Sequence, residues 1–266
     1  MSLDAARGLL ACPYCGEPLT ADGRRWACPG GHSFDVARQG YLNLAGGPEP
    51  VNADTAAMLD ARARVQASGL FGFLSRALDD AVPSAAGRLL EVGAGTGHYL
   101  AELVDGRPAA RGVALDVSRA AARRAARAHP RVASVVADVW RGLPIRAGAA
   151  DVVLCVFAPR NLAEFARVLT PGGVVLVVTP EPRHLAGLRA GFGLIGVEAD
   201  KHERLLAAAS GHLVHRASTT AESTATVGAE LVNDLIGMGP NAFHTAPRAT
   251  TSEPLELAVR LDVFGL

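Results

Sequence analysis

The chain has 266 residues, of which 49% are hydrophobic, and its 26 basic and 26 acidic side chains give a net charge of zero. This length accommodates one full core and a small additional module. The neutral balance excludes a global electrostatic attraction to nucleic acid and weakens, without excluding, an RNA-binding function. No apolar run reaches the ~18 residues of a membrane span, and the amino terminus lacks an export signal, so we expect a soluble, cytoplasmic protein with no membrane partner.

The amino-terminal segment carries a metal-binding pattern, Cys12-x2-Cys15-x12-Cys28-x3-His32. Two thiolates on one turn can share a tetrahedral ion, and the later cysteine and histidine complete a Cys3His shell. Without an export signal, such a cluster favours a metal over disulfides. We predict one structural zinc per chain, because protein ligands fill all four positions. The alternative, a reduced loop with incidental cysteines, leaves residues 1–45 with little core.

Two helices are predicted after a joint rich in glycine and proline, at residues 54–66, with Asp54 as the N-cap, and at residues 71–82. The pattern then alternates, with strands near residues 88–92, 112–115, 134–137, 151–157 and 174–179, and helices near residues 98–104, 118–128 and 161–169. Short apolar strands separated by helices indicate a parallel sheet covered on both faces. Cys155, alone in such a strand, is expected to be a small buried hydrophobe.

The pattern weakens beyond Pro182. Helices are expected near residues 184–191, 202–209 and 227–238, and strands near residues 213–218 and 255–264. The last of these alternates in hydrophobicity as a closing strand does.

A glycine-rich loop follows the first strand of the α/β region, as Glu91-Val92-Gly93-Ala94-Gly95-Thr96-Gly97. A dinucleotide site prefers the spacing G-x-G-x-x-G, which places helix amides against a pyrophosphate. Here the spacing is G-x-G-x-G, and the negative charge of Glu91 would repel a phosphate bound at this loop. A cationic sulfonium ligand that carries an ammonium group benefits from that charge.

Two further acids end the next strands, at the edge of the sheet where ligands bind. Asp116 ends the second strand, where a carboxylate can accept both ribose hydroxyls, and Asp138 ends the third, where it can accept the exocyclic amine of adenine. Each acid alone has an alternative role as a solvent-facing cap. Their joint placement with Glu91 makes S-adenosylmethionine the preferred cofactor.

Arginines recur on the helix after Asp116, at Arg119, Arg123 and Arg127, with Arg124 and Arg131 beside them. An RNA-facing stripe is one interpretation, but a solvated helix face is the commoner explanation for such spacing. We therefore predict no functional role for these residues from the sequence.

Several segments together resemble, in order, the bacterial 23S rRNA (guanine-N1)-methyltransferases. They are the metal pattern with its return at residues 28–35, residues 40–44, Met58-x3-Arg62, the glycine loop, Ala158-Pro159 and residues 179–185. The resemblance is close from residue 9 to about residue 190 and looser beyond. It implies an α/β fold of the class I S-adenosylmethionine-dependent methyltransferases, a Rossmann-like doubly wound sheet with a small N-terminal zinc-binding domain.

The resemblance also implies an organisation and a set of donor contacts. Residues 1–45 are expected to form a zinc module that helps bind an rRNA hairpin, residues 46–83 a linker and helices covering the donor pocket, and residues 84–266 the methyltransferase domain. Gly95, Thr96 and His184 are implied to line that pocket, with Phe71 where relatives can carry tyrosine. Members of the family work as homodimers, and some protect ribosomes from macrolides.

The chemistry requires a base, because N1 of guanine carries a proton that must leave before or during methyl transfer. The sequence does not identify that base, and Glu164 and His98 are the candidates.

Two other functional classes remain open: a methyltransferase acting on a small molecule, and a regulatory protein that binds the donor without catalysis. We also expect that loss of the metal abolishes RNA affinity, and that neither this loss nor deletion of residues 1–45 affects donor binding.

Overall fold

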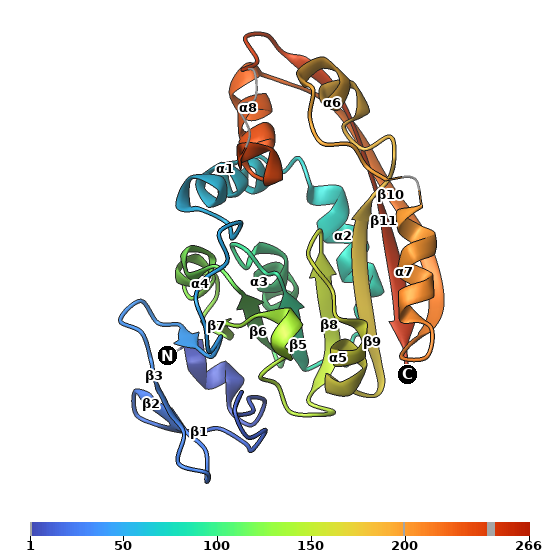
Figure 1. Ribbon diagram of the computed structural model, residues 1–266. Coiled ribbons are helices and arrows are strands. Elements are labelled where there is room, and N and C mark those ends of the chain that lie inside the picture. The colour runs from blue at the N-terminus through green and yellow to red at the C-terminus, as the bar shows by residue number, and fades with distance from the viewer. Residues whose placement is uncertain (1, 199, 244–247) are drawn as a thin grey trace.

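A mixed β-sheet of eight strands forms the centre of the structure, a computed structural model that describes residues 2–198, 200–243 and 248–266 (Figure 1). From one edge to the other, its strands are β4 (Leu42–Asn43), β7 (Val132–Val136), β6 (Arg111–Asp116), β5 (Arg88–Val92), β8 (Ala150–Val156), β9 (Leu169–Pro180), β11 (Glu253–Gly265) and β10 (Val214–Val227). The strand order reverses at β5, which has β6 on one side and β8 on the other. Ligands of open α/β sheets bind at such a reversal.

The predicted parallel sheet is confirmed for β5 to β9, while β4 adds a parallel strand that was not predicted and the predicted closing strand, β11, is antiparallel. Neighbouring strands from β4 to β9 pair in parallel, whereas β11 is antiparallel to both β9 and β10. The sequence also predicted a short strand at residues 213–218, but β10 extends to Val227. Its added residues are mostly Ser, Thr and Ala and stay largely exposed, so they lack the apolar alternation that marks a half-buried strand.

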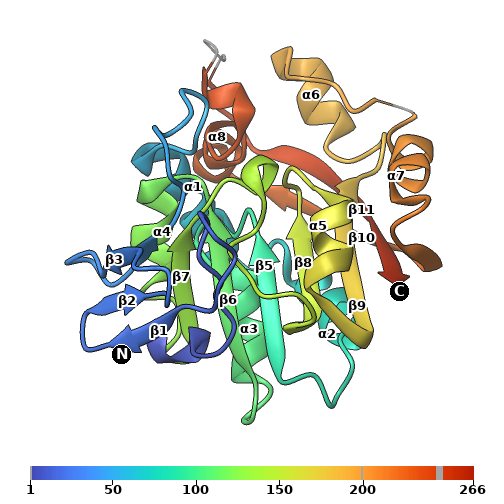
Figure 2. The same cartoon turned by 60° about the horizontal axis from the view of Figure 1, so that its bottom comes forward.

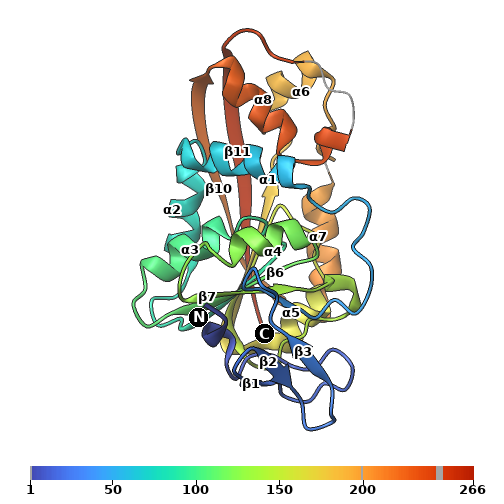
Figure 3. The same cartoon turned by 90° about the vertical axis from the view of Figure 1, so that its left-hand side faces the viewer.

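Helices cover both faces of the sheet. One face carries α2 (Gly72–Ala81), α3 (His98–Asp105) and α4 (Arg119–Ala125), and the other carries α5 (Leu162–Val168) and α7 (Lys201–Ala209) (Figure 3). Beyond the carboxyl ends of the strands, α1 (Ala56–Ala67) packs on α8 (Ala229–Gly237), and α6 (Ala186–Phe192) contacts β11. No helix within the described ranges has the length and apolar character needed to cross a membrane.

The first helix begins one residue later than expected. Thr55, rather than Asp54, is its N-cap, because the Thr55 hydroxyl accepts a hydrogen bond from the amide of Met58 at 3.3 Å. The Asp54 carboxylate instead accepts from the Arg62 guanidinium at 2.5 Å. Asp54, which lies just before α1, therefore holds the guanidinium of Arg62 in place within that helix.

The amino-terminal segment packs directly against the main sheet. It consists of the 3-10 helix η1 (Ser2–Ala6) and an antiparallel ribbon of β1 (Thr20–Asp22), β2 (Arg25–Ala27) and β3 (Ser33–Asp35). This ribbon lies next to β7, at the sheet edge opposite β10 (Figure 2). Leu3, Leu10 and Trp26 are buried in the same apolar cluster as Val113 and Val135 of β6 and β7.

Strand β4 joins the amino-terminal segment to the sheet itself, since Leu42 and Asn43 pair in parallel with Val135 and Val136. The contacts of η1 are with β6 and β7, where α/β folds ordinarily place a covering helix. The amino-terminal segment therefore supplies part of the core that the rest of the chain needs.

Candidate metal centre and donor site

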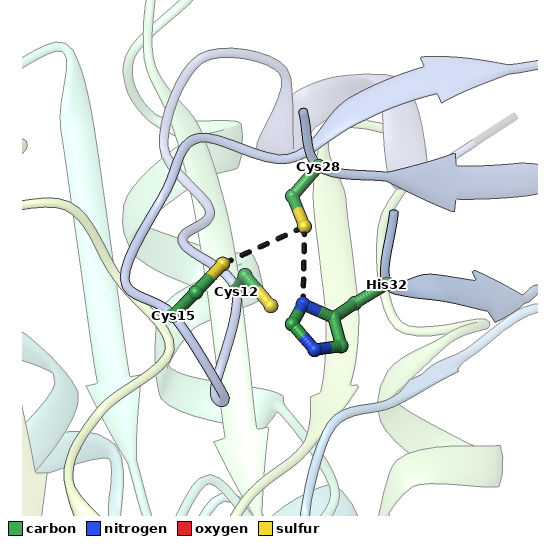
Figure 4. A group of neighbouring side chains, drawn as sticks. All are labelled: Cys12, Cys15, Cys28 and His32. Carbon is green, nitrogen blue, oxygen red and sulfur yellow. Dashed lines mark hydrogen bonds between the residues drawn. The ribbon is translucent and has the colours of Figure 1, made fainter. Parts of the chain in front are cut away.

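The metal-binding residues lie on two tight turns that face each other (Figure 4). On the first turn, the amide of Gly16 donates to the carbonyl of Cys12 at 2.9 Å, with Gly16 at a φ of 74°. On the second, the amide of Gly31 donates to the carbonyl of Cys28 at 3.1 Å, with Gly31 at a φ of 83°. Glycine adopts this left-handed backbone without steric cost, so each turn can present its ligands to the other.

The four ligand atoms converge as a tetrahedral shell requires. The sulfurs of Cys12, Cys15 and Cys28 and a ring nitrogen of His32 all lie within 4.8 Å of one another. Cys15 Sγ is 3.6 Å from Cys28 Sγ, which is 3.4 Å from His32 Nδ1. Zinc–sulfur bonds of roughly 2.3 Å in a tetrahedron place two sulfurs about 3.8 Å apart. The residues therefore fit one structural zinc, and no second cluster of this kind occurs in the described ranges.

The glycine loop connects β5 to α3 beside the strand-order reversal. Gly93, Gly95 and Gly97 have φ values of 71°, 54° and 77°, and the amides of Gly93 and Ala94 donate to the carbonyl of Leu115. A Cβ at Gly93 would lie 2.3 Å from the Cβ of Ala158, in the segment that follows β8. Both the backbone conformation and this close approach require glycine, so the loop brings the ends of β5 and β8 together.

Asp116 anchors this loop from the end of β6. Its Oδ2 accepts from the amide of Gly95 at 2.8 Å, and its Oδ1 accepts from the amide of Ser118 at 2.8 Å. Burial raises the pKa of Asp116, and the two amide hydrogen bonds oppose that rise. The carboxylate thus lies beside the loop at the carboxyl edge of the sheet.

Helix α1 lies over the loop. A Cβ at Gly95 would be 2.6 Å from Arg62 Nη1, and the Thr96 hydroxyl donates to Gln66 Oε1 at 2.7 Å. Arg62 Nη2 also donates to the carbonyl of Met238, just after α8, at 2.7 Å. These contacts join α1 and the end of α8 to the loop, and they explain why residue 95 must be small.

Glu91 is buried beneath the loop, with 2% of its surface exposed. Its Oε2 accepts from the amide of Leu100 in α3 at 3.3 Å. Burial raises the pKa of Glu91 to about 8, so in the ligand-free chain the carboxyl is protonated at neutral pH. The negative charge expected at this position therefore requires a nearby cation to develop.

This burial predicts a pH dependence of stability. The pKa of Glu91 rises from 4.5 to about 8 on folding, so in that window the folded chain binds a proton that the unfolded chain has released. Stability should fall as pH rises from 4.5 to about 8. Glu91→Gln is neutral and of equal size, and its urea-unfolding midpoint should vary less with pH. An equal pH dependence in both proteins would contradict the burial effect.

Three aromatic rings lie together on the β8 and β9 side of the strand-order reversal, whereas Asp116 ends β6 on the other side. The ring of His184 is 6.1 Å from the ring of Phe71 and 6.1 Å from that of Phe157, and the two phenylalanine rings are 6.4 Å apart. His184 Nδ1 accepts from the amide of Ala258 at 3.2 Å, and burial lowers the pKa of His184 to about 4. The imidazole is therefore neutral, with its proton on Nε2, and can donate a hydrogen bond.

Phe157 was not among the residues predicted from the sequence. It directly follows β8, has a φ of 54° and leaves 44% of its surface exposed. A left-handed conformation costs a bulky residue about 1 to 3 kcal/mol and tends to occur at functional sites. The signal in the sequence is an aromatic residue before Ala158-Pro159, at the end of a strand.

Cys155 is fully buried in β8, as predicted, and its thiol donates to the carbonyl of Ala158.

The remaining predicted residues lie at the same edge or close to it. Asp138 follows β7, and its Oδ1 accepts from the amide of Trp140 at 3.0 Å. His98 begins α3, directly after the loop, and its Nε2 is 3.4 Å from Glu102 Oε1. Glu164 accepts from the amide of Leu143 at 2.7 Å and pairs with Arg167, and this pairing lowers its pKa. A carboxylate so occupied is a poor general base.

Comparisons with known proteins match both parts of the chain. Residues 10–52 match the family model for the N-terminal zinc ribbon of RlmA, and residues 89–173 match a methyltransferase domain. A 23S rRNA (guanine(748)-N(1))-methyltransferase of Streptomyces fradiae is 43% identical over 90% of this chain and 87% of its own length. A protein of Micromonospora griseorubida, provisionally named for 23S rRNA (guanine-N1) methylation, is 42% identical over 95% of both chains.

A solved structure supports the fold. A chain from the complex between the Haloferax volcanii Trm112 methyltransferase activator and a methyltransferase superposes with a TM-score of 0.56. The two are 18% identical, over 81% of this chain and 99% of that one. The domain is thus a class I methyltransferase fold that uses S-adenosylmethionine, preceded by a zinc ribbon. With its full-length relatives, this shows that the chain belongs to the family of 23S rRNA (guanine-N1)-methyltransferases.

Proposed function

We propose that this chain transfers a methyl group from S-adenosylmethionine to N1 of a guanine in a hairpin of 23S rRNA. The observation that carries the proposal is the match to relatives of that activity over nearly the whole chain, ribbon included. A methyltransferase for a small molecule has no need of the ribbon.

The donor contacts follow from the geometry of the strand ends. Asp116 would accept the ribose hydroxyls, and Asp138 would accept the adenine amine, since Asp116 ends β6 and Asp138 follows the end of its neighbour β7, at the edge where ligands bind. The donor could approach the backbone at Gly93, Gly95, Thr96 and Gly97. Glu91, buried beneath this loop, would face the positive charge of the donor. His184, which follows β9, and Phe71, the N-cap of α2, would line the pocket.

The reaction requires alignment more than activation. S-adenosylmethionine supplies a methyl group already activated by its sulfonium, and the chain must align nucleophile, carbon and sulfur and exclude water. Phe71, Phe157 and His184 form an aromatic wall suited to excluding water. Of the two candidate bases, the geometry favours His98, because it borders the glycine loop and its burial keeps the imidazole neutral by lowering its pKa.

We also propose that the protein acts in the cytoplasm as a homodimer and that the modification protects ribosomes from macrolides. The resemblance to the family supports each statement. Strand β10 supports a dimer further, since it is an exposed edge strand of 14 residues, and proteins usually cover edges of that length. Light scattering of the purified chain and macrolide sensitivity of an expressing strain test these two statements.

The activity is tested with 23S rRNA fragments and isotopically labelled donor. We expect label to enter the hairpin and reverse transcriptase to stop at one guanine, because methylation at N1 blocks base pairing. A variant with His98 replaced by asparagine should transfer methyl groups at least ~100-fold more slowly if His98 is the base. A wild-type protein that binds donor but methylates no rRNA would favour the small-molecule class if small acceptors are methylated, and the regulatory class if none is.

A further inference from the structure

The arginines beside α4 form a basic surface that the donor site does not use. Between Asp116 and Asp138 the chain has five arginines and no acidic residue. Arg123, Arg124 and Arg127 line a surface hollow of about 260 Å³, completed by Ala56 and Ala120. The protein as a whole has no net charge, so this is a local concentration of positive charge.

Most of this charge is not neutralised within the chain. Arg124 is paired with Asp60, and Arg131 donates to backbone carbonyls, including that of Ala110 at 2.7 Å. Within the described ranges, the guanidinium groups of Arg123 and Arg127 have no hydrogen bond or ion pair, and neither does that of Arg119. Glu49 lies near Arg119, because it accepts a hydrogen bond from the Arg119 amide at 3.0 Å.

The inner side of α4 contacts both the donor loop and the zinc-bearing segment. A Cβ at Gly97 would lie 3.2 Å from the Cβ of Ala125, and a Cβ at Gly40 would lie 3.7 Å from that of Ala126. Ala122 packs in one cluster with Tyr41, which lies just before β4. Helix α4 thus lies between α1 and the amino-terminal ribbon (Figure 1). Arg123 and Arg127 are exposed there and line the hollow.

We propose that Arg123 and Arg127, with Arg124 at the wall of the hollow, bind the phosphate backbone of the substrate RNA. This inference rests on the proposed function and assigns a role to residues for which the sequence predicted none. One planar guanidinium group can donate two parallel hydrogen bonds to the oxygens of one phosphate. A bound anion would also neutralise the charges of Arg123 and Arg127, which have no acidic partner in the described part of the chain. Phosphate contacts fix the position of an RNA, while its bases give specificity. The hollow is placed to hold the strand between the ribbon and the donor site.

The test is a double variant, Arg123→Gln with Arg127→Gln, in the full chain. Binding to the 23S rRNA hairpin is measured from about 50 to about 200 mM salt, since each phosphate contact adds roughly 0.7 to 0.9 to the slope of log affinity against log salt. We expect the slope to fall by about 1.4 to 1.8 and the affinity at low salt to fall about 10-fold or more. The KM for RNA should rise, while kcat and S-adenosylhomocysteine binding stay unchanged.

Two further variants control for charge and fold. Arg123→Lys with Arg127→Lys keeps both charges and should retain the slope. Arg204→Gln on α7 removes an arginine whose side chain is 64% exposed, on the other face of the sheet, and should leave both slope and KM unchanged. If the wild type methylates the hairpin and the glutamine variant keeps its full slope and affinity, the surface does not bind RNA, and an acidic protein becomes its alternative partner. If the wild type methylates no rRNA, the proposed function itself fails.

Discussion

Replacing Cys28 by serine is expected to remove the bound zinc and to destabilise the entire chain. Cys28 supplies one of four ligands, and zinc bound to such shells contributes about 10 to 16 kcal/mol, comparable to or larger than the ~5 to 15 kcal/mol stability of a typical domain. The ribbon shares its apolar cluster with β6 and β7, so its loss should expose part of the sheet. Metal content and thermal unfolding measure the two effects.

This expectation revises the one drawn from the sequence, in which metal loss or deletion of residues 1–45 spares donor binding. Asp116 ends β6, the strand that η1 covers, so we now expect donor affinity to fall together with the metal. Cys155→Ala is the matched control, since this cysteine is buried far along the chain in β8 and should leave the zinc content at wild-type levels. Equal zinc in Cys28→Ser and the wild type would contradict the ligand assignment, and full donor affinity in a metal-free Cys28→Ser protein would contradict the coupling.

Replacing Asp116 by alanine is expected to weaken donor binding by about 5- to 150-fold. The change removes the proposed acceptor of the ribose hydroxyls and leaves the amides of Gly95 and Ser118 without their partner. An unsatisfied buried polar group costs about 1 to 3 kcal/mol, and each 1.4 kcal/mol corresponds to about one factor of ten in affinity. Calorimetric titration with S-adenosylhomocysteine measures the loss.

Asp116→Asn separates the two contributions, because its amide oxygen can still accept one of the backbone hydrogen bonds. We expect an affinity between those of the alanine variant and the wild type. Asp80→Ala, on the exposed side of α2, is the control for loss of an acidic side chain and should bind the donor normally. Unchanged binding in a folded Asp116→Ala protein would leave Asp116 with a purely structural role as an anchor of the loop.

The zinc ligands and the parallel part of the sheet could be predicted from the sequence because their signals are local. Cys12, Cys15, Cys28 and His32 lie close together in the chain, and their spacing alone satisfies a tetrahedral shell. Strand β5 begins and ends at the predicted residues, 88 and 92, since a short run of buried apolar residues meets a glycine turn. The sequence placed the N-cap of α1 one residue early, because Asp54 and Thr55 both have side chains that can cap a helix, and Thr55 is the one that does so.

Tertiary structure determined the features that depend on residues distant in the chain. The direction of β11 follows from its pairing with β9 and β10, which an alternating pattern does not encode. The left-handed conformation of Phe157 and the contact between Gly93 and Ala158 arise where two strand ends meet. Arg123 and Arg127 gain significance only once the fold leaves them without acidic partners among the described residues, beside the hollow between α1 and α4. Residue spacing thus determined the ligand set and the order of elements, whereas packing between distant segments determined which side chains are free to act.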